Sequence, residues 1–157
     1  MFMPDSPQNS YIEVSQALIC KNDYFLIQLR DFKSSIESPG HWGFFAGHIE
    51  NGENAEQTMW RELHEELCWQ PERFCFLGNI IYGNGKMHVF QCELKEDVKT
   101  LSLQEGEEID VFTEKEIIHG LLFSQKKNQY FPITKISRTV YNLFIINHHV
   151  SASIIKH

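Results

Sequence analysis

The sequence predicts an α/β fold in which a mixed β-sheet lies between helices. β-prone runs occur on both sides of one central helical pattern, and one or two further helical patterns follow near the C-terminus. A chain of 157 residues fits one domain and is long enough to bury a substantial core. We expect a single domain over residues 11–150, preceded by a loose arm at 1–10 and followed by a tail at 151–157.

Composition and charge exclude several classes of protein. Hydrophobic residues make up 42% of the chain and aromatic residues 13%, as is typical of globular proteins. The net charge of −7 argues against general nucleic-acid binding and against binding to anionic membranes, because both need a basic surface. The four cysteines show no CxxC pairing, so we expect reduced thiols instead of a zinc site or a disulfide framework. No signal peptide or membrane span is recognised, so a cytoplasmic location is expected.

The N-terminal elements are predicted to be a hairpin, a loop and an aromatic strand. Residues 11–20 and 24–30 are β-rich, and the polar Lys21-Asn22-Asp23 between them is typical of a hairpin turn. Residues 31–40 contain serine, proline and glycine, which favours a loop, and this loop is a candidate border of a substrate site. Residues 41–49 are aromatic and β-prone, and a turn follows them at 50–52.

A helix with an acidic face is predicted next. Asn54 is a favourable N-cap, and Gln57 three residues later completes a capping-box pattern. The spacing of Glu62, Glu65 and Glu66 places their side chains on one face of that helix. A separate apolar stripe available for packing on a core is formed by Met59, Leu63 and Leu67.

The acidic face points to a metal ion. Three carboxylates on one face repel each other, and a hard divalent cation such as Mg²⁺ removes that cost because it takes oxygen ligands. A solvated helix face is the plainer alternative for such a charge pattern. A zinc-protease helix is rejected, because that motif needs a second histidine four residues after His64 and Cys68 stands there.

The C-terminal half is predicted to contain a second strand pair and two helices. Gly83-Asn84-Gly85 is a strong turn signal, Thr113 and Glu116 form a capping-box pattern, and Ile133, Ile136 and Val140 recur at helical spacing. The expected elements are strands at 74–82 and 87–94, a polar segment at 96–106, a short strand at 107–112, a helix from 113 to about 122 and a helix from 133 to about 147.

The stretch from Gly47 to Trp69 resembles the Nudix box, G-x5-E-x7-R-E-U-x-E-E-x-G-U, where U is a bulky apolar residue. The residues in register are Gly47, Glu53, Arg61, Glu62, Leu63, Glu65, Glu66 and Trp69. Cys68 is the one departure, since it stands where the family has its second glycine. That glycine ends the helix in a left-handed conformation, which costs a residue with a Cβ roughly 1 kcal/mol. We therefore expect a slightly altered helix end and intact metal ligands.

The resemblance implies a Nudix-type α/β/α sandwich and hydrolysis that depends on Mg²⁺, with Mn²⁺ as a substitute. It assigns Mg²⁺ to Glu62, Glu65 and Glu66, with the backbone carbonyl of Ala46 as a further ligand. Glu65 and Glu66 therefore also belong to the implied catalytic set. Small residues at Ala46 and Gly47 allow the backbone to approach the carboxylates.

The remaining site residues are assigned with their alternatives left open. Arg61 would pair with Glu53 and hold the array in place, or would form a plain surface ion pair. A further carboxylate, as metal ligand or base for the attacking water, is usual after the last long strands of the family; Glu105 resembles it best, and Glu107 and Glu108 compete with it. Arg30 would hold a phosphate or would merely end its strand in solvent. The aromatic residues considered for stacking on a base, each of which is more often core, are Trp42, Phe44, Phe45 and Tyr82.

The expected reaction is hydrolysis of a nucleoside diphosphate linked to another moiety, with a nucleoside triphosphate or a nucleotide sugar ranked first as the substrate. A catalytically silent Nudix-like module that binds or senses a nucleotide is the alternative, although such a module would be expected to lose box carboxylates. RNA-end processing is disfavoured because no basic patch is present in the sequence. A homodimer is left open, since family members often pair.

Overall fold

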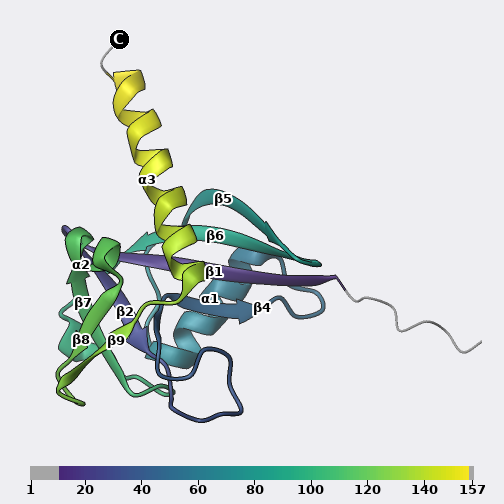
Figure 1. Ribbon diagram of the computed structural model, residues 1–157. Helices are drawn as coiled ribbons and strands as arrows, with labels where there is room; N and C mark the ends of the chain where they lie inside the picture. Colours follow the sequence, from purple (N-terminus) through teal and green to yellow (C-terminus); the bar gives the residue numbers. More distant parts are fainter. Residues whose placement is uncertain (1–10, 156–157) are drawn as a thin grey trace, which may run out of the picture.

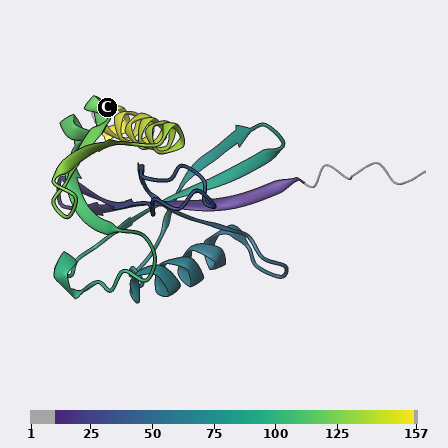
Figure 2. The ribbon, with the colours of Figure 1, turned by 60° about the horizontal axis from the view of Figure 1, so that its bottom comes forward.

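A mixed sheet between two helices forms the body of the protein. The computed structural model describes residues 11–155, and side chains up to residue 149, so the predicted arm at 1–10 lies outside the described residues. The seven-stranded sheet has α1 (Ala55–Leu67) on one face and α3 (Lys135–Ile155) on the other (Figures 1 and 2). This arrangement confirms the predicted α/β fold. Among the described residues, no helix combines the length and apolar character needed to cross a membrane.

The strand β1 (Ile12–Lys21) has two different partners along one edge. Its second half forms the predicted antiparallel hairpin with β2 (Tyr24–Leu29), and its first half pairs with β4 (Phe45–His48). The two-residue strand β3 (Trp42–Gly43) pairs with β2. The segment at 41–49, predicted as one aromatic strand, is therefore divided, because β3 pairs with β2 and β4 pairs with β1. We call the place where β2 and β4 diverge along this edge of β1 the fork in the sheet.

The other edge of β1 pairs in parallel with β6 (Gly85–Glu93), which forms the second predicted hairpin with β5 (Cys75–Tyr82). On the far side of β2 lies β7 (Glu108–Thr113), in antiparallel pairing. The polar segment before β7 contains a short 3₁₀ helix, η1 (Val98–Thr100).

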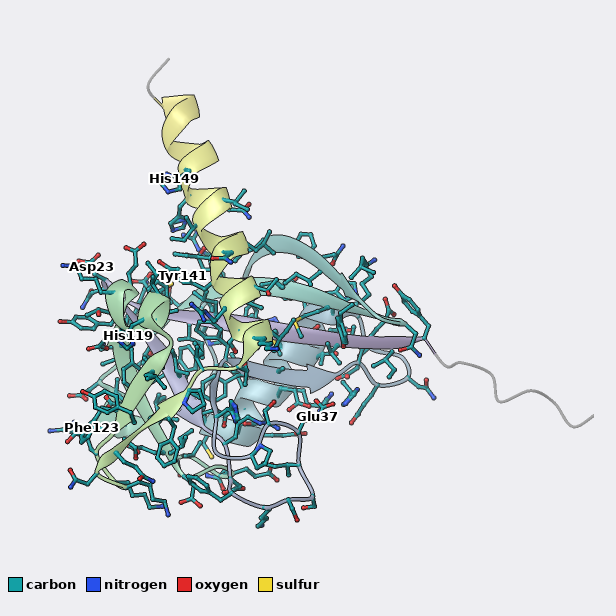
Figure 3. The ribbon with its side chains drawn as sticks, in the orientation of Figure 1. Asp23, Glu37, His119, Phe123, Tyr141 and His149 are labelled. Carbon is teal, nitrogen blue, oxygen red and sulfur yellow. The ribbon has the colours of Figure 1, made fainter. Side chains whose placement is uncertain are left out.

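The core consists of two apolar clusters on opposite faces of the sheet. Met59, Leu63 and Leu67 are fully buried beneath α1, which confirms the predicted stripe. Val140 and Tyr141 of α3 lie in the second cluster, on the other face (Figure 3). The carboxylates Glu62, Glu65 and Glu66 of α1 belong to neither of these two clusters.

Two C-terminal elements differ from the prediction. The helix α2 (Glu114–His119) begins with the predicted capping box but ends at Gly120, which is left-handed with a φ of 86°. The chain then forms a hairpin of β8 (Leu121–Ser124) and β9 (Gln129–Pro132), which was not predicted. Since glycine favours the left-handed conformation that ends a helix, the short helix stops before residue 122.

The helix predicted at 133–147 is displaced and longer. It begins at Lys135, after Thr134 accepts a hydrogen bond from the N–H of Ser137 at 3.2 Å, and continues to Ile155. The expected boundary of a tail at residue 151 therefore falls within α3. No glycine or proline follows residue 147, so the sequence offers no signal that would end the helix there.

Both ends of α1 are well defined. Asn54 accepts a hydrogen bond from the N–H of Gln57 at 2.8 Å, and the Gln57 side chain accepts one from the N–H of Asn54, also at 2.8 Å. At the other end, Cys68 adopts the left-handed conformation with a φ of 50°, and its N–H donates to the carbonyl of His64 at 3.0 Å. The expected alteration of the helix end is therefore wrong: cysteine takes the conformation that glycine would take.

Replacing Cys68 with glycine should stabilise the protein. A residue with a Cβ in the left-handed conformation costs about 1 kcal/mol, which glycine avoids, so the melting temperature should rise by about 2–4 °C. Cys68→Ala keeps the Cβ and serves as the control, and it should give no such rise. Thermal unfolding of the three proteins measures the difference, and an equal rise in both variants would show that backbone strain at this position is not the cause.

Candidate active site

A cavity of about 540 Å³ lies beside the fork in the sheet. Its walls come from β1, β2 and β4, from α1, from the loop before β7 and from the beginning of α3. This volume is in the range that holds a small ligand. The predicted site residues that line it are Arg30, Ala46, Gly47, Glu66 and Glu105.

Glu66 presents the most perturbed carboxyl group of this wall. The pKa of Glu66 is raised to about 7, chiefly by burial of the carboxyl group and also by the negative charges of Glu62 and Glu105. The positive charge of Arg30 and a hydrogen bond from the Gln28 side chain act in the opposite direction. The groups that act on Glu66 belong to α1, to β2 and the residue after it, and to the loop before β7. The fold therefore brings side chains from three separate segments together around this carboxyl group.

Gly47 gives Glu62 its place against the sheet. A Cβ built on Gly47 would overlap the carboxylate of Glu62. The side chain of Glu62 is 16% exposed, and its burial raises the pKa of the carboxyl group, while Arg61 acts to lower it. Only glycine at position 47 allows a helix carboxylate to lie directly on the backbone of β4.

Arg61 binds the acidic residues of this region to one another. Its Nε and Nη2 atoms donate to the two oxygens of Glu53 at 2.8 and 2.9 Å, and its Nη1 donates to Glu62 at 2.8 Å and to Glu65 at 3.4 Å. The first contact lowers the pKa of Glu53 to about 2, chiefly through the hydrogen bond from Arg61. The predicted pairing of Arg61 with Glu53 is confirmed, and Arg61 also fixes carboxylates of α1.

The carbonyl of Ala46 points away from β1. Hydrogen-bonded and non-hydrogen-bonded pairs alternate along an antiparallel ladder. Ile49 donates to the carbonyl of Glu13 at 3.1 Å, so Ala46, three residues earlier, belongs to a non-hydrogen-bonded pair. Its carbonyl therefore points in the same direction as that of His48, which accepts a hydrogen bond from Arg61 at 3.1 Å. This direction is suitable for a backbone ligand beside the carboxylates.

The loop before β7 is attached to the end of α1. The N–H of Gln104 donates to the carbonyl of Glu66 at 2.9 Å, and the N–H of Ser102 donates to that of Leu67 at 3.1 Å. These bonds hold Glu105 close to Glu66. They also use carbonyls that the last turn of a helix leaves without a partner.

The two competitors of Glu105 face other groups. Glu107 forms ion pairs with Lys126 at 3.0 Å and with Lys127 at 3.6 Å, and Glu108 accepts a hydrogen bond from the N–H of Gln125 at 3.0 Å. Of these three glutamates, Glu105 is the one that lines the cavity.

Arg30 is held at the cavity by the loop of residues 31–40. Its Nε donates to the carbonyl of Glu37 at 2.8 Å, and Glu37 lies on that loop (Figure 3). Arg30 lines the same cavity as Glu66 and Glu105, and its positive charge acts to lower the pKa of Glu66. These contacts favour a role of Arg30 at the cavity over the alternative that it merely ends its strand in solvent.

The sequence matches one domain family over most of its length. A sequence model of the NUDIX domain matches residues 14–134. The chain belongs to the NUDIX family. The resemblance of the stretch from Gly47 to Trp69 to the Nudix box is thereby confirmed.

Individual relatives agree with this assignment. The MutT protein of Methanosarcina mazei Go1 has a TM-score of 0.70 at 19% identity, covering 91% of this chain and 99% of that one. The NUDIX domain of Shewanella oneidensis NrtR, solved as a complex with ADP ribose, has a TM-score of 0.68 at 13% identity, covering 88% and 89%. These likenesses show the fold. An RNA pyrophosphohydrolase of Pseudoalteromonas translucida is 55% identical over 31 residues. This match covers 20% of this chain and 18% of the length of that relative.

The Nudix carboxylates are close together but are not a preformed metal site. Glu65 is 56% exposed and turns with Glu62 toward Arg61, whereas Glu66 faces the cavity. Within residues 11–149, no three carboxylate, imidazole or thiolate groups converge as metal ligands. The donor chemistry nevertheless fits Mg²⁺: the groups are oxygen donors, and the charges of Glu62 and Glu105 raise the pKa of Glu66, a cost that a cation would relieve.

Two glutamines of the site were not predicted. Gln16 is 2% exposed and Gln28 is 6% exposed, and both line the cavity. The available signal was a polar side chain within an otherwise apolar strand. Among the aromatic candidates, Trp42, Phe44 and Phe45 are core residues, although Phe44 touches the cavity, while Tyr82 is 38% exposed at its wall.

The raised pKa of Glu66 predicts how stability depends on pH and Mg²⁺. Glu66 titrates near 7 when folded and near 4.5 when unfolded, so its contribution to stability is present at low pH and is lost as the pH rises through about 7. With a chelator present, Glu66 should contribute a fall of on the order of 2 kcal/mol in the free energy of unfolding between pH 5.5 and 8, and Mg²⁺ should stabilise the protein more at pH 8. Glu66→Gln should remove most of both effects in urea titrations. Equal pH dependence in the two proteins would contradict the assignment.

Proposed function

We propose that the protein hydrolyses a phosphoanhydride bond in a nucleoside diphosphate linked to another moiety, with Mg²⁺ as cofactor and Mn²⁺ as a substitute. The observation that carries the proposal is the wall of the cavity, where the carboxyl of Glu66 lies within reach of the charges of Glu62, Glu105 and Arg30. Acidic groups that hold a cation and a guanidinium that holds a phosphate are the two requirements for binding a charged diphosphate.

The residues of the chain take separate roles in this proposal. Glu62, Glu65 and Glu66, with the carbonyl of Ala46, would hold Mg²⁺, which when bound screens the phosphate charge and lowers the pKa of a coordinated water. Arg30 binds a phosphate and orients it toward this wall. Glu105 lines the same cavity from the loop before β7 and receives the proton of the attacking water, or acts as a further ligand. Arg61 positions Glu53, Glu62 and Glu65.

Nucleoside triphosphates and nucleotide sugars are the first candidates for the substrate. The ADP ribose bound in the NrtR NUDIX domain is a nucleoside diphosphate linked to a sugar, which supports this class. The cavity of about 540 Å³ is large enough for a mononucleotide, with room for part of a second moiety.

The 5′-triphosphate end of an RNA is a second candidate, because the Pseudoalteromonas relative is named an RNA pyrophosphohydrolase. The net charge of −7 disfavours it, since RNA binding depends on basic surface. A nucleotide-binding module without turnover is a third candidate, which the complete set of box carboxylates disfavours.

A substrate panel tests these candidates together. The protein would be incubated with Mg²⁺ and nucleoside triphosphates, ADP ribose, nucleotide sugars, dinucleotides or a 5′-triphosphorylated oligoribonucleotide, and the products would be identified by mass spectrometry. Hydrolysis of a mononucleotide substrate that stops when Mg²⁺ is chelated supports the proposal. Preference for the oligoribonucleotide supports RNA-end processing, and saturable binding without any product supports the silent module.

A further inference from the structure

One polar atom at the cavity lacks a partner. Gln16 is 2% exposed, and its Oε1 is buried without a hydrogen-bond partner among the described residues. Leaving a buried amide oxygen unpaired is costly, so such an atom in a native protein calls for an explanation, and a ligand that pairs with it is one. The cavity that Gln16 lines offers room for such a ligand.

The surroundings of Gln16 are apolar. On β1 it shares a face with Val14 and Leu18, and its cross-strand neighbours are Ala46 on β4 and Val89 on β6. Val14, Phe44 and Met87 also line the cavity, and all three are less than 10% exposed. A flat, largely apolar group such as a nucleobase suits this part of the wall, whereas a phosphate does not.

Other polar groups nearby are already used by the protein. The hydroxyl of Thr134 donates to the hydroxyl of Ser137 at 2.7 Å, and Ser137 accepts a hydrogen bond from the N–H of Phe44 at 3.1 Å. Arg30, Glu66 and Glu105 carry charge and serve the phosphate end of the cavity in the proposed function. Gln28, the other buried glutamine of the cavity, hydrogen-bonds to Glu66. Among the described residues that line the cavity, Gln16 has a buried side-chain oxygen without a protein partner, so this oxygen is available to a ligand.

We propose that Gln16 is a specificity-determining residue, whose side-chain oxygen accepts a hydrogen bond from an N–H of the substrate's nucleobase. The proposal rests on the proposed function in that it takes this cavity as the nucleotide site. It also predicts the orientation of the bound nucleotide. The base lies against β1 and β6 under α3, and the phosphates extend toward Glu66 and Arg30. A buried acceptor without a protein donor should discriminate strongly between ligands that present an N–H to it and ligands that do not, because the latter leave the acceptor unpaired.

Equilibrium binding tests the proposal without requiring turnover. The probes are AMP, CMP, GMP, UMP and ribose 5-phosphate, titrated by calorimetry into the wild type and Gln16→Met, which has nearly the same volume. At least one nucleotide should bind the wild type about tenfold more tightly than ribose 5-phosphate, and Gln16→Met should remove most of that ratio without weakening ribose 5-phosphate. Gln129→Met, at an exposed position of β9, is the matched control and should keep the ratio.

Stability gives a second, independent readout. Since Gln16→Met removes an unpaired buried oxygen, the melting temperature of the ligand-free protein should rise. A fall in melting temperature, or an unchanged ratio between nucleotide and ribose 5-phosphate, would show that Gln16 is structural and would overturn the proposal. If hydrolysis fails on every substrate while the base-dependent ratio behaves as expected, the proposed function fails and the assignment of Gln16 stands.

Discussion

Glu66→Gln is expected to lower kcat by about 10²–10³-fold with little loss of structure. The substitution keeps the shape of the side chain and an oxygen that accepts the hydrogen bond from Gln28, but it removes the negative charge at the cavity. A divalent cation needs a negatively charged oxygen at this position, and the neutral amide oxygen of glutamine is a much weaker ligand.

The measurement is steady-state hydrolysis of the best substrate of the panel, with circular dichroism to verify the fold. Glu56→Gln is the matched control, because Glu56 is an exposed residue in the first turn of the same helix, and it should leave kcat within about twofold. A Glu66→Gln protein that retains wild-type kcat would refute the assigned role of this carboxylate.

Gly47→Ala is expected to lower both stability and turnover. The added methyl group would occupy the position of the Glu62 carboxylate, so Glu62 must leave its place against β4 and part of its contact with Arg61 is lost. We expect a loss of about 1–3 kcal/mol in the free energy of unfolding and a fall of about 10²-fold in kcat.

A double-mutant cycle isolates the cause of this effect. In a Glu62→Ala background the obstructing side chain is absent, so Gly47→Ala should cost much less stability than in the wild type. Urea unfolding of the four proteins measures the coupling between the two positions. If the glycine substitution is equally destabilising in both backgrounds, steric overlap with Glu62 is not the reason for glycine at position 47.

The central helix and its acidic face could be predicted from the sequence because the signals for them are local. The capping box of Asn54 and Gln57, the buried stripe of Met59, Leu63 and Leu67 and the spacing of the carboxylates all follow from the periodicity of one helix. The contact between Arg61 and Glu53 was also predicted, from the resemblance to the Nudix box, and the structure confirms it.

What the sequence did not predict depends on contacts between distant segments. Residues 41–49 are divided at Phe44 because β3 pairs with β2 and β4 pairs with β1, and neither pairing can be identified from the local pattern. The β8–β9 hairpin was missed because the capping box at Thr113 favoured a helix through residues that follow the left-handed Gly120. Glu105 could not be separated from Glu107 and Glu108 before the positions of Lys126 and Gln125 were known.

The attachment of residues 102–104 to the last turn of α1 has a consequence for heat tolerance. The backbone of Ser102 and Gln104 is bonded to the carbonyls of Leu67 and Glu66, so Glu105 and Glu66 keep their separation only while that helix end is intact. Helix ends fray at lower temperatures than the centres of sheets. On warming, activity should therefore vanish several degrees before the molecule as a whole melts, and cooling should restore it in full.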